Sequence, residues 1–237
     1  MGQRQLTAAD GHTFGAYEAL PAGVPNGAVV VIQEIFGVNS HIRAVVDGYA
    51  KDGYAAIAPQ IFDRCEANVE LGYTDQTDFD KGLKFAFQDM DMAQTLLDVQ
   101  AALDAAAAHG KVGVVGYCFG GLLTWLSACK LNGVTAASAY YGGGIAGHAT
   151  LTAQCPVMMH FGEKDAHISM SDVETVRSAQ PDVQVFVYDA DHGFNCDERG
   201  SYDATSAATA KERTLAFFEK HLGSDDDFDQ TVIMKSD

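Results

Sequence analysis

Cys118 stands in a stretch that could turn a thiol into a nucleophile. A short apolar run, Val112–Val115, leads into Gly116-Tyr117-Cys118-Phe119-Gly120-Gly121, and the apolar segment Leu122–Leu131 that follows is long enough for a helix. Glycines two residues before and after the cysteine let a strand and a helix meet at a sharp turn. A helix N-terminus behind the thiol favours a thiolate and a developing oxyanion. By itself, the pattern fits a buried structural cysteine equally well.

Two further residues complete a catalytic set in the order nucleophile, acid, base. Asp165 follows the expected strand Val157–Phe161, and His192 follows the expected strand Val183–Tyr188. A cysteine nucleophile needs a general base and a carboxylate that orients it. Alone, Asp165 fits a helix cap or turn and His192 fits a loop histidine. The joint occurrence of the three after three strands favours a catalytic triad.

Histidine and glutamate side chains near Asp165 raise the alternative of a metal site. Glu163, His160 and His167 lie within a few residues of it, but their spacing fits no zinc motif. We therefore expect strand packing and solvated loop positions for these side chains, and no metal.

Strands alternate with helices along the chain. This alternation predicts an α/β fold with a mostly parallel central sheet and helices on both faces, where ligands bind outside the carboxyl ends of the strands. Beyond those above, the expected strands are Thr13–Leu20 (at an edge), Ala28–Ile32, Tyr54–Ala58 and Val134–Tyr141. The expected helices are Asn39 or Ser40 to Lys51, Asp89–His109, Ser169–Ala179 and Ala204–Leu222.

Two regions depart from this alternation. Ile61–Phe87 is irregular and polar, and we expect an excursion or lid over a pocket. Residues 1–222 are predicted to form a single domain, followed by an acidic tail, Gly223–Asp237, in which Thr231–Met234 could dock as a short strand.

Composition limits the partners. The net charge of −17 argues against nucleic acid and anionic membranes, because phosphates would be repelled. Five cysteines without a CxxC pair indicate reduced thiols, and we expect a cytoplasmic protein. The sequence has neither a signal peptide pattern nor a run of about 18 apolar residues, so no membrane association is expected.

The combination of motifs resembles the dienelactone hydrolase (carboxymethylenebutenolidase) family of α/β-hydrolases. The matching pieces are Asp10–Ala16, Gln33-Glu34-Ile35-Phe36-Gly37, Gly53–Ala56, Lys111–Gly121, Tyr140-Tyr141-Gly142 and Asp191-His192-Gly193-Phe194. The resemblance implies an α/β-hydrolase fold and a triad of Cys118, Asp165 and His192. It further implies that Glu34 pairs with the resting thiol until substrate displaces it, whereas residues alone suggest an ordinary loop carboxylate.

The resemblance also suggests how substrate is bound. The strand–turn–helix pattern predicts the backbone N–H of Phe119 as one donor of an oxyanion hole, and the resemblance implies that of Ile35 as the other. The resemblance also implies no cofactor and a small-molecule ester or lactone as substrate. Family members hold a substrate carboxylate with arginines, but Cys196 occupies one of the matching positions. The substrate-binding candidates are Phe36, Tyr140, Lys81, Lys84, Arg64 and Arg199. The alternative function is a non-hydrolytic, redox-sensing or ligand-binding thiol protein that retains the fold, and the sequence does not predict an oligomeric state.

Overall fold

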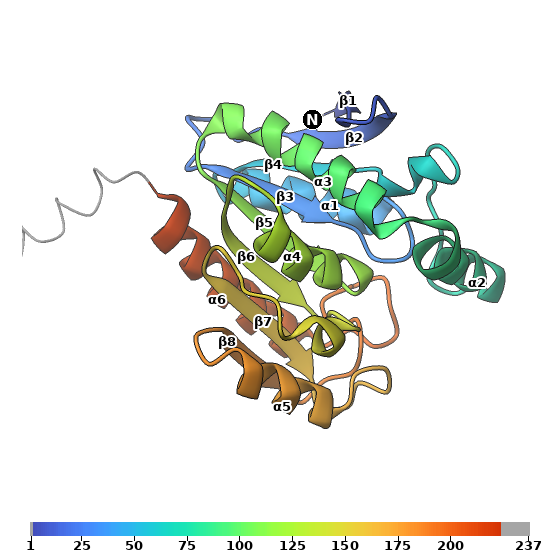
Figure 1. Cartoon of the computed structure of the whole chain (residues 1–237), viewed down its shortest axis with the longest axis vertical. Helices are drawn as coiled ribbons and strands as arrows, with labels where there is room; N and C mark the ends of the chain where they lie inside the picture. Colours follow the sequence, from blue (N-terminus) through green and yellow to red (C-terminus); the bar gives the residue numbers. More distant parts are fainter. Residues whose placement is uncertain (1, 224–237) are drawn as a thin grey trace, which may run out of the picture.

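An eight-stranded sheet runs through the computed structural model, which describes residues 2–223 (Figure 1). The strands lie in the order β1-β2-β4-β3-β5-β6-β7-β8. β1 and β2 are antiparallel to their neighbours, and the remaining strands are parallel. Their bounds are β1 Gly2–Thr7, β2 Thr13–Ala19, β3 Ala28–Ile32, β4 Ala55–Pro59, β5 Val112–Tyr117, β6 Val134–Tyr140, β7 Val157–Gly162 and β8 Gln184–Tyr188.

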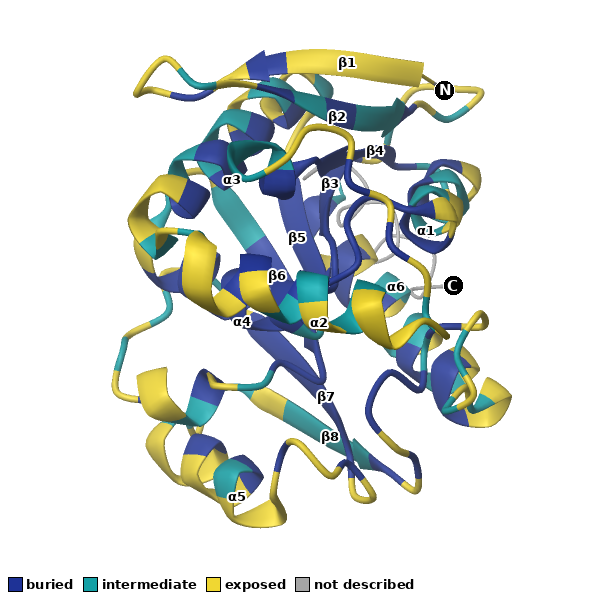
Figure 2. Cartoon of the chain, turned by 90° about the vertical axis from the view of Figure 1, so that its right-hand side faces the viewer, coloured by how far each residue is buried: buried dark blue, intermediate teal, exposed yellow. Residues whose placement is uncertain are grey.

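The middle of the sheet is its most buried part. Every residue of β3, β4 and β5 is buried, as expected for strands covered by helices on both faces (Figure 2). The expectation that Thr13–Leu20 forms an edge strand is wrong, because β1 pairs along β2 and takes the edge. Leu6 is the single buried residue of β1, so its sequence carries little apolar signal.

Helices cover both faces of the sheet (Figure 1). α1 and α6 share one face, where the rings of Tyr49 and Phe218 lie 6.2 Å apart, and α3 and α4 pack on the other. Most predicted helices are confirmed, and side chains cap several of them: Asn39 caps α1, and Ser169 forms a capping box with Asp172 in α5. The helices are α1 Ser40–Lys51, α2 Gln76–Lys84, α3 Met92–Ala106, α4 Phe119–Lys130, α5 Met170–Ala179 and α6 Ala204–Leu222.

The region expected to be irregular contains ordered helix. A 3₁₀ turn, Ile61–Arg64, precedes α2, and a π-helical turn, Phe85–Asp89, continues directly from α2. In Figure 1, α2 stands apart from the helices that cover the sheet. The acidic tail, with the short strand expected at Thr231–Met234, lies beyond the described residues.

A buried polar cluster attaches α6 to the sheet. The hydroxyl of Thr214 lies 2.7 Å from the Tyr140 hydroxyl, 3.0 Å from that of Ser138 and 3.1 Å from Nε2 of His160. Nδ1 of His160 bonds the hydroxyl of Tyr188. Burial lowers the pKa of His160 to about 3, so this ring is a neutral packing group in the core.

Candidate active site

Cys118 sits on a strained turn between β5 and α4. Its backbone has φ 55° and ψ −116°, a conformation that a residue with a side chain rarely adopts. The flanking glycines are needed for close packing. A Cβ at Gly116 would lie 2.1 Å from the carbonyl oxygen of Gly120, and a Cβ at Gly120 would lie 2.3 Å from that of Ile32. The turn therefore has the strand–nucleophile–helix geometry that the glycine spacing predicts.

His192 and Asp165 are bonded to each other in the loops that follow β8 and β7. Nδ1 of His192 lies 2.7 Å from Oδ2 of Asp165, and both side chains are almost fully buried. Oδ1 of Asp165 accepts the backbone N–H groups of His167 (2.8 Å) and Ile168 (3.1 Å). Burial opposes the ionised carboxyl, but these bonds outweigh it and lower the pKa of Asp165.

The electrostatics favour a protonated His192 beside Cys118. Burial of the ring disfavours the imidazolium, but the bond to Asp165 and the adjacent Cys118 thiol outweigh it and raise the pKa of His192 to about 10. Because Nδ1 faces Asp165, Nε2 is the nitrogen left to exchange a proton with the thiol.

Glu34 has a different partner from the one that the family resemblance implies. It lies in the loop after β3, fully buried, and its Oε1 accepts a hydrogen bond from Nη1 of Arg199 at 3.2 Å. Its Oε2 has no partner among the described residues. Instead of bonding to Cys118, the carboxylate forms an ion pair with a cation. Burial of Arg199 opposes its charge, but Glu34 and nearby Cys118 outweigh this and raise the pKa of the guanidinium.

The side chain of Arg199 packs between a glycine and an aromatic ring. Gly193, next to His192, has φ +77°, and a Cβ there would lie 2.5 Å from Nη1 of Arg199. On another side, the guanidinium carbon lies 5.8 Å from the centre of the Phe36 ring, within reach of a cation–π interaction. Two of the sequence candidates, Phe36 and Arg199, therefore meet next to Glu34.

Of the two adjacent tyrosines, the structure brings the second one to the site. Tyr140, a substrate-binding candidate, is fully buried and its hydroxyl bonds Thr214, which is the position of a core residue. The ring of Tyr141 lies 5.2 Å from that of His192, on a backbone with φ 36°. Its buried hydroxyl has no partner among the described residues. Tyr140 is the last residue of β6 and Tyr141 follows it. Since both are tyrosines, the sequence alone does not indicate which of them reaches the site.

The remaining cationic candidates are held by carboxylates outside the triad. Arg64 forms a bidentate pair with Asp98, at 2.7 Å for both bonds, and also contacts Asp10. Lys81 bonds Glu66 (2.8 Å), and Lys84 bonds Asp89 (2.5 Å). Arg199 is therefore the candidate cation that the structure associates with the site.

The backbone N–H groups of Ile35 and Phe119 are available as donors. Both residues are buried, and neither N–H donates to an acceptor within residues 2–223. Buried N–H groups without a partner are rare in proteins. Phe119 opens α4, where the first N–H groups of a helix have no partner inside the helix. Phe119 directly follows Cys118, and Ile35 lies in the loop after β3, the strand that pairs with β5.

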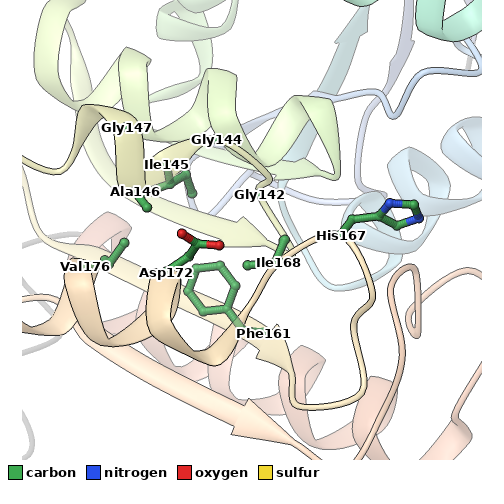
Figure 3. Close-up of a pocket in the computed structure, with 10 residues that line it drawn as sticks. All are labelled: Gly142, Gly144, Ile145, Ala146, Gly147, Phe161, His167, Ile168, Asp172 and Val176. Carbon is green, nitrogen blue, oxygen red and sulfur yellow. The ribbon is translucent and has the colours of Figure 1, made fainter.

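A small cavity adjoins the loop that carries Asp165. Its volume is about 140 Å³, and Figure 3 shows its apolar lining from Ile145, Phe161, Ile168 and Val176, with one carboxylate from Asp172. His167 lies at its rim, with its ring turned away from the apolar side chains in Figure 3.

The fold and site define an α/β-hydrolase: a mostly parallel sheet of this strand order, a strained cysteine at the β5–α4 turn, and an acid and a histidine after β7 and β8. The chain belongs to the dienelactone hydrolase family, whose sequence profile matches residues 14–222.

Individual relatives agree with this assignment. A carboxymethylenebutenolidase of Pseudomonas putida is 35% identical, with 88% of this chain and 92% of the relative covered. A Synechocystis protein assigned the same activity by name is 39% identical with the same coverage. A crystal structure from Klebsiella pneumoniae, titled as a candidate dienelactone hydrolase, has a TM-score of 0.79 at 32% identity and covers 93% of this chain and 100% of its own. The chain is therefore a hydrolase of the lactone and ester type that acts on small molecules. Within residues 2–223, no helix is long and apolar enough to cross a membrane.

Proposed function

We propose that this chain hydrolyses carboxylic esters or lactones through an acyl-thioester on Cys118, with His192 as general base and acid and Asp165 as its orienting carboxylate. The observation that carries the proposal is the 2.7 Å bond between His192 Nδ1 and Asp165, which leaves Nε2 for the cysteine on the strained turn. The sequence independently predicts the same three residues in the order nucleophile, acid, base, and the resemblance to the family implies the same set.

The reaction runs in two steps. Transfer of the Sγ proton to Nε2 of His192 forms the imidazolium that the electrostatics of the site favour, and the thiolate attacks the carbonyl carbon. The tetrahedral intermediate collapses, and the leaving oxygen takes the proton from Nε2 while the thioester forms. A water molecule then gives a proton to Nε2 and attacks the thioester carbonyl. The C–S bond breaks, the acid is released, and Sγ takes the proton from Nε2, which restores the thiol and the neutral imidazole. The proposal needs no cofactor.

The free N–H groups of Ile35 and Phe119 are the proposed oxyanion hole. An oxyanion hole places donors about 2.7–3.1 Å from the developing charge, and loss of one donor costs about 3 kcal/mol of transition-state stabilisation. Supporting this role, both groups are buried and without an acceptor in the described part of the chain.

We further propose that Arg199 holds a carboxylate on the substrate. The Pseudomonas putida relative carries a name that specifies a carboxymethylene group on a lactone. Arg199 is bonded to Glu34 through a single contact of 3.2 Å, which a substrate carboxylate could replace. Glu34 is then a group displaced by substrate, as the resemblance implies, although its resting partner is an arginine and not the thiol.

Turnover of an activated aryl ester tests the proposal. We expect a rapid acylation phase followed by slow hydrolysis, lost in Cys118→Ala and His192→Ala and retained in Cys155→Ala, which removes a half-buried thiol elsewhere. Equal rates in wild type and Cys118→Ala would refute Cys118 as the nucleophile, whereas no turnover in wild type would leave the alternative of a non-hydrolytic thiol protein. For Arg199, we compare paired esters with and without a free carboxylate. Arg199→Met should raise KM about tenfold or more for the acidic ester alone.

A further inference from the structure

Two contacts connect the segment Gln76–Asp89 to the residues that carry the proposed oxyanion donors. Gly82 of α2 lies on the carbonyl group of Ile35: a Cβ built at Gly82 would come within 2.1 Å of the oxygen and 3.1 Å of the carbonyl carbon. The ring of Phe87, in the π-helical turn, packs edge-on against the ring of Phe119 at 5.5 Å. One segment thus touches both residues.

The contact with Ile35 explains why a glycine stands inside α2. Glycine in a helix interior costs about 1 kcal/mol relative to alanine, and Gly82 has no positive φ that would require it. Gly48, inside α1, differs from Gly82 in this respect, because a Cβ at Gly48 would meet no atom within 4 Å. At Gly82 the missing side chain is what allows the helix to approach the Ile35 peptide.

The second contact leaves an aromatic ring partly in solvent. Phe85 opens the π-helical turn and is buried against Phe62, with ring centres 5.6 Å apart. Phe87, two residues later, is 60% exposed and still packs on Phe119. Lys84 and Asp89 form an ion pair across the turn at 2.5 Å. Turns of this kind are frequent at functional sites, because they re-aim side chains within a helix.

We propose that the segment Gln76–Asp89 is a positioning element for the oxyanion hole. Gly82 packs on the carbonyl group of Ile35 and so fixes the residue whose N–H is the donor, and Phe87 fixes the start of α4 at Phe119. The inference rests on the proposed function, because it assigns a task to those two donors. A Cβ at Gly82 needs about 3.4 Å from its neighbours, so the Ile35 peptide or α2 must shift by about 1 Å. A misplacement of about 1 Å can cost about a hundredfold in rate.

Gly82→Ala tests the first contact, with Gly48→Ala as the matched control. Two reactions of Cys118 are followed by mass spectrometry of its peptide: acylation by an aryl ester, which develops an oxyanion, and alkylation by iodoacetamide, which displaces iodide at carbon. We expect Gly82→Ala to slow acylation at least tenfold and alkylation less than twofold, and Gly48→Ala to change neither. Unchanged acylation, or an equal loss in both reactions, would overturn the positioning role.

Phe87→Ala tests the second contact. Because the Phe87 side chain is largely exposed, its truncation should not unfold the protein. We expect kcat for the aryl ester to fall about fivefold or more, with alkylation unchanged. Tyr202→Ala, at another exposed aromatic residue, serves as the control and should leave kcat unchanged. A Phe87→Ala variant with wild-type kcat overturns the role of Phe87.

Hydrogen exchange separates this inference from the proposed function. The peptide that spans residues 33–38 should exchange faster in Gly82→Ala than in wild type or Gly48→Ala, whether or not the chain turns over an ester. Unchanged exchange there refutes the contact-based positioning even if activity falls. Wild-type turnover that does not depend on Cys118 refutes the proposed function and leaves the exchange result to decide the positioning.

Discussion

Replacement of Arg199 should leave the buried carboxylate of Glu34 without its ion-pair partner. The carboxylate of Glu34 is fully buried, its Oε2 has no partner in the described part of the chain, and Nη1 of Arg199 is the donor on Oε1. Arg199→Met keeps the length of the side chain but leaves the carboxylate without its cation. Breaking a buried ion pair in this way typically costs about 3–5 kcal/mol. Since Arg199 retains 18% exposure, we expect the lower end, about 3 kcal/mol.

Urea unfolding at neutral pH measures this loss. For a chain of this length, 1 kcal/mol corresponds to about 2–4 °C, so thermal unfolding should shift down by about 6–12 °C. Adding Glu34→Gln removes the charge and should return about 1–3 kcal/mol to the Arg199→Met variant. The control is Arg177→Met, whose 4.0 Å pair with Glu174 is exposed and should matter by less than about 1 kcal/mol. A loss in Arg199→Met no larger than in this control, with no rescue by Glu34→Gln, would refute the reasoning.

Three further variants test other parts of the structure. Gly116→Ala places a Cβ 2.1 Å from a carbonyl oxygen of α4, so urea unfolding should show a loss of about 1–3 kcal/mol or more, whereas Gly23→Ala, in open space, should lose nothing. Thr214→Val removes the hydroxyl shared by three buried polar groups and should cost about 1–3 kcal/mol, which the same assay checks. The pKa of His192 is raised to about 10, so the protonated ring stabilises the folded state. This stabilisation is fully present below about pH 6.5 and is lost as the pH rises toward 10. The stability advantage of wild type over Asp165→Asn should therefore shrink between pH 6.5 and 10, and an advantage independent of pH would contradict this assignment.

The sequence was sufficient where local pattern and burial agree. β3 spans Ala28–Ile32 and α6 spans Ala204–Leu222, as predicted, because one is a continuous β-branched run and the other a long helix with an apolar face. It was insufficient for β1 and α2. β1 buries Leu6 alone, and α2 buries Gly82 alone, so neither carries an apolar period. Both are stabilised by tertiary contacts: β1 by pairing with β2, and α2 by its approach to the Ile35 loop.

The same limit applies to the candidate site. Cys118, Asp165 and His192 could be placed because each lies in the turn or short loop that follows a strand of predictable type. The pairing of Arg199 with Glu34 depends on how the chain turns after His192. The N–H of Cys196 bonds the carbonyl of Gly193, and the N–H of Arg199 bonds that of Cys196, so two successive turns bring the arginine back to the site. Residue types and spacing do not specify such a path.

The order of the strands has a consequence for how activity is acquired during folding. Glu34 follows β3, Cys118 follows β5, Tyr141 follows β6, and Asp165 and His192 follow β7 and β8. Within residues 2–223, β8 is the far edge of the sheet and the last strand to leave the ribosome, so His192 joins Cys118 only after the other seven strands of this part have been synthesised. A nascent chain released before β8 would hold the thiol without its partner, and ester turnover in a refolding experiment would report completion of the sheet and not its nucleation.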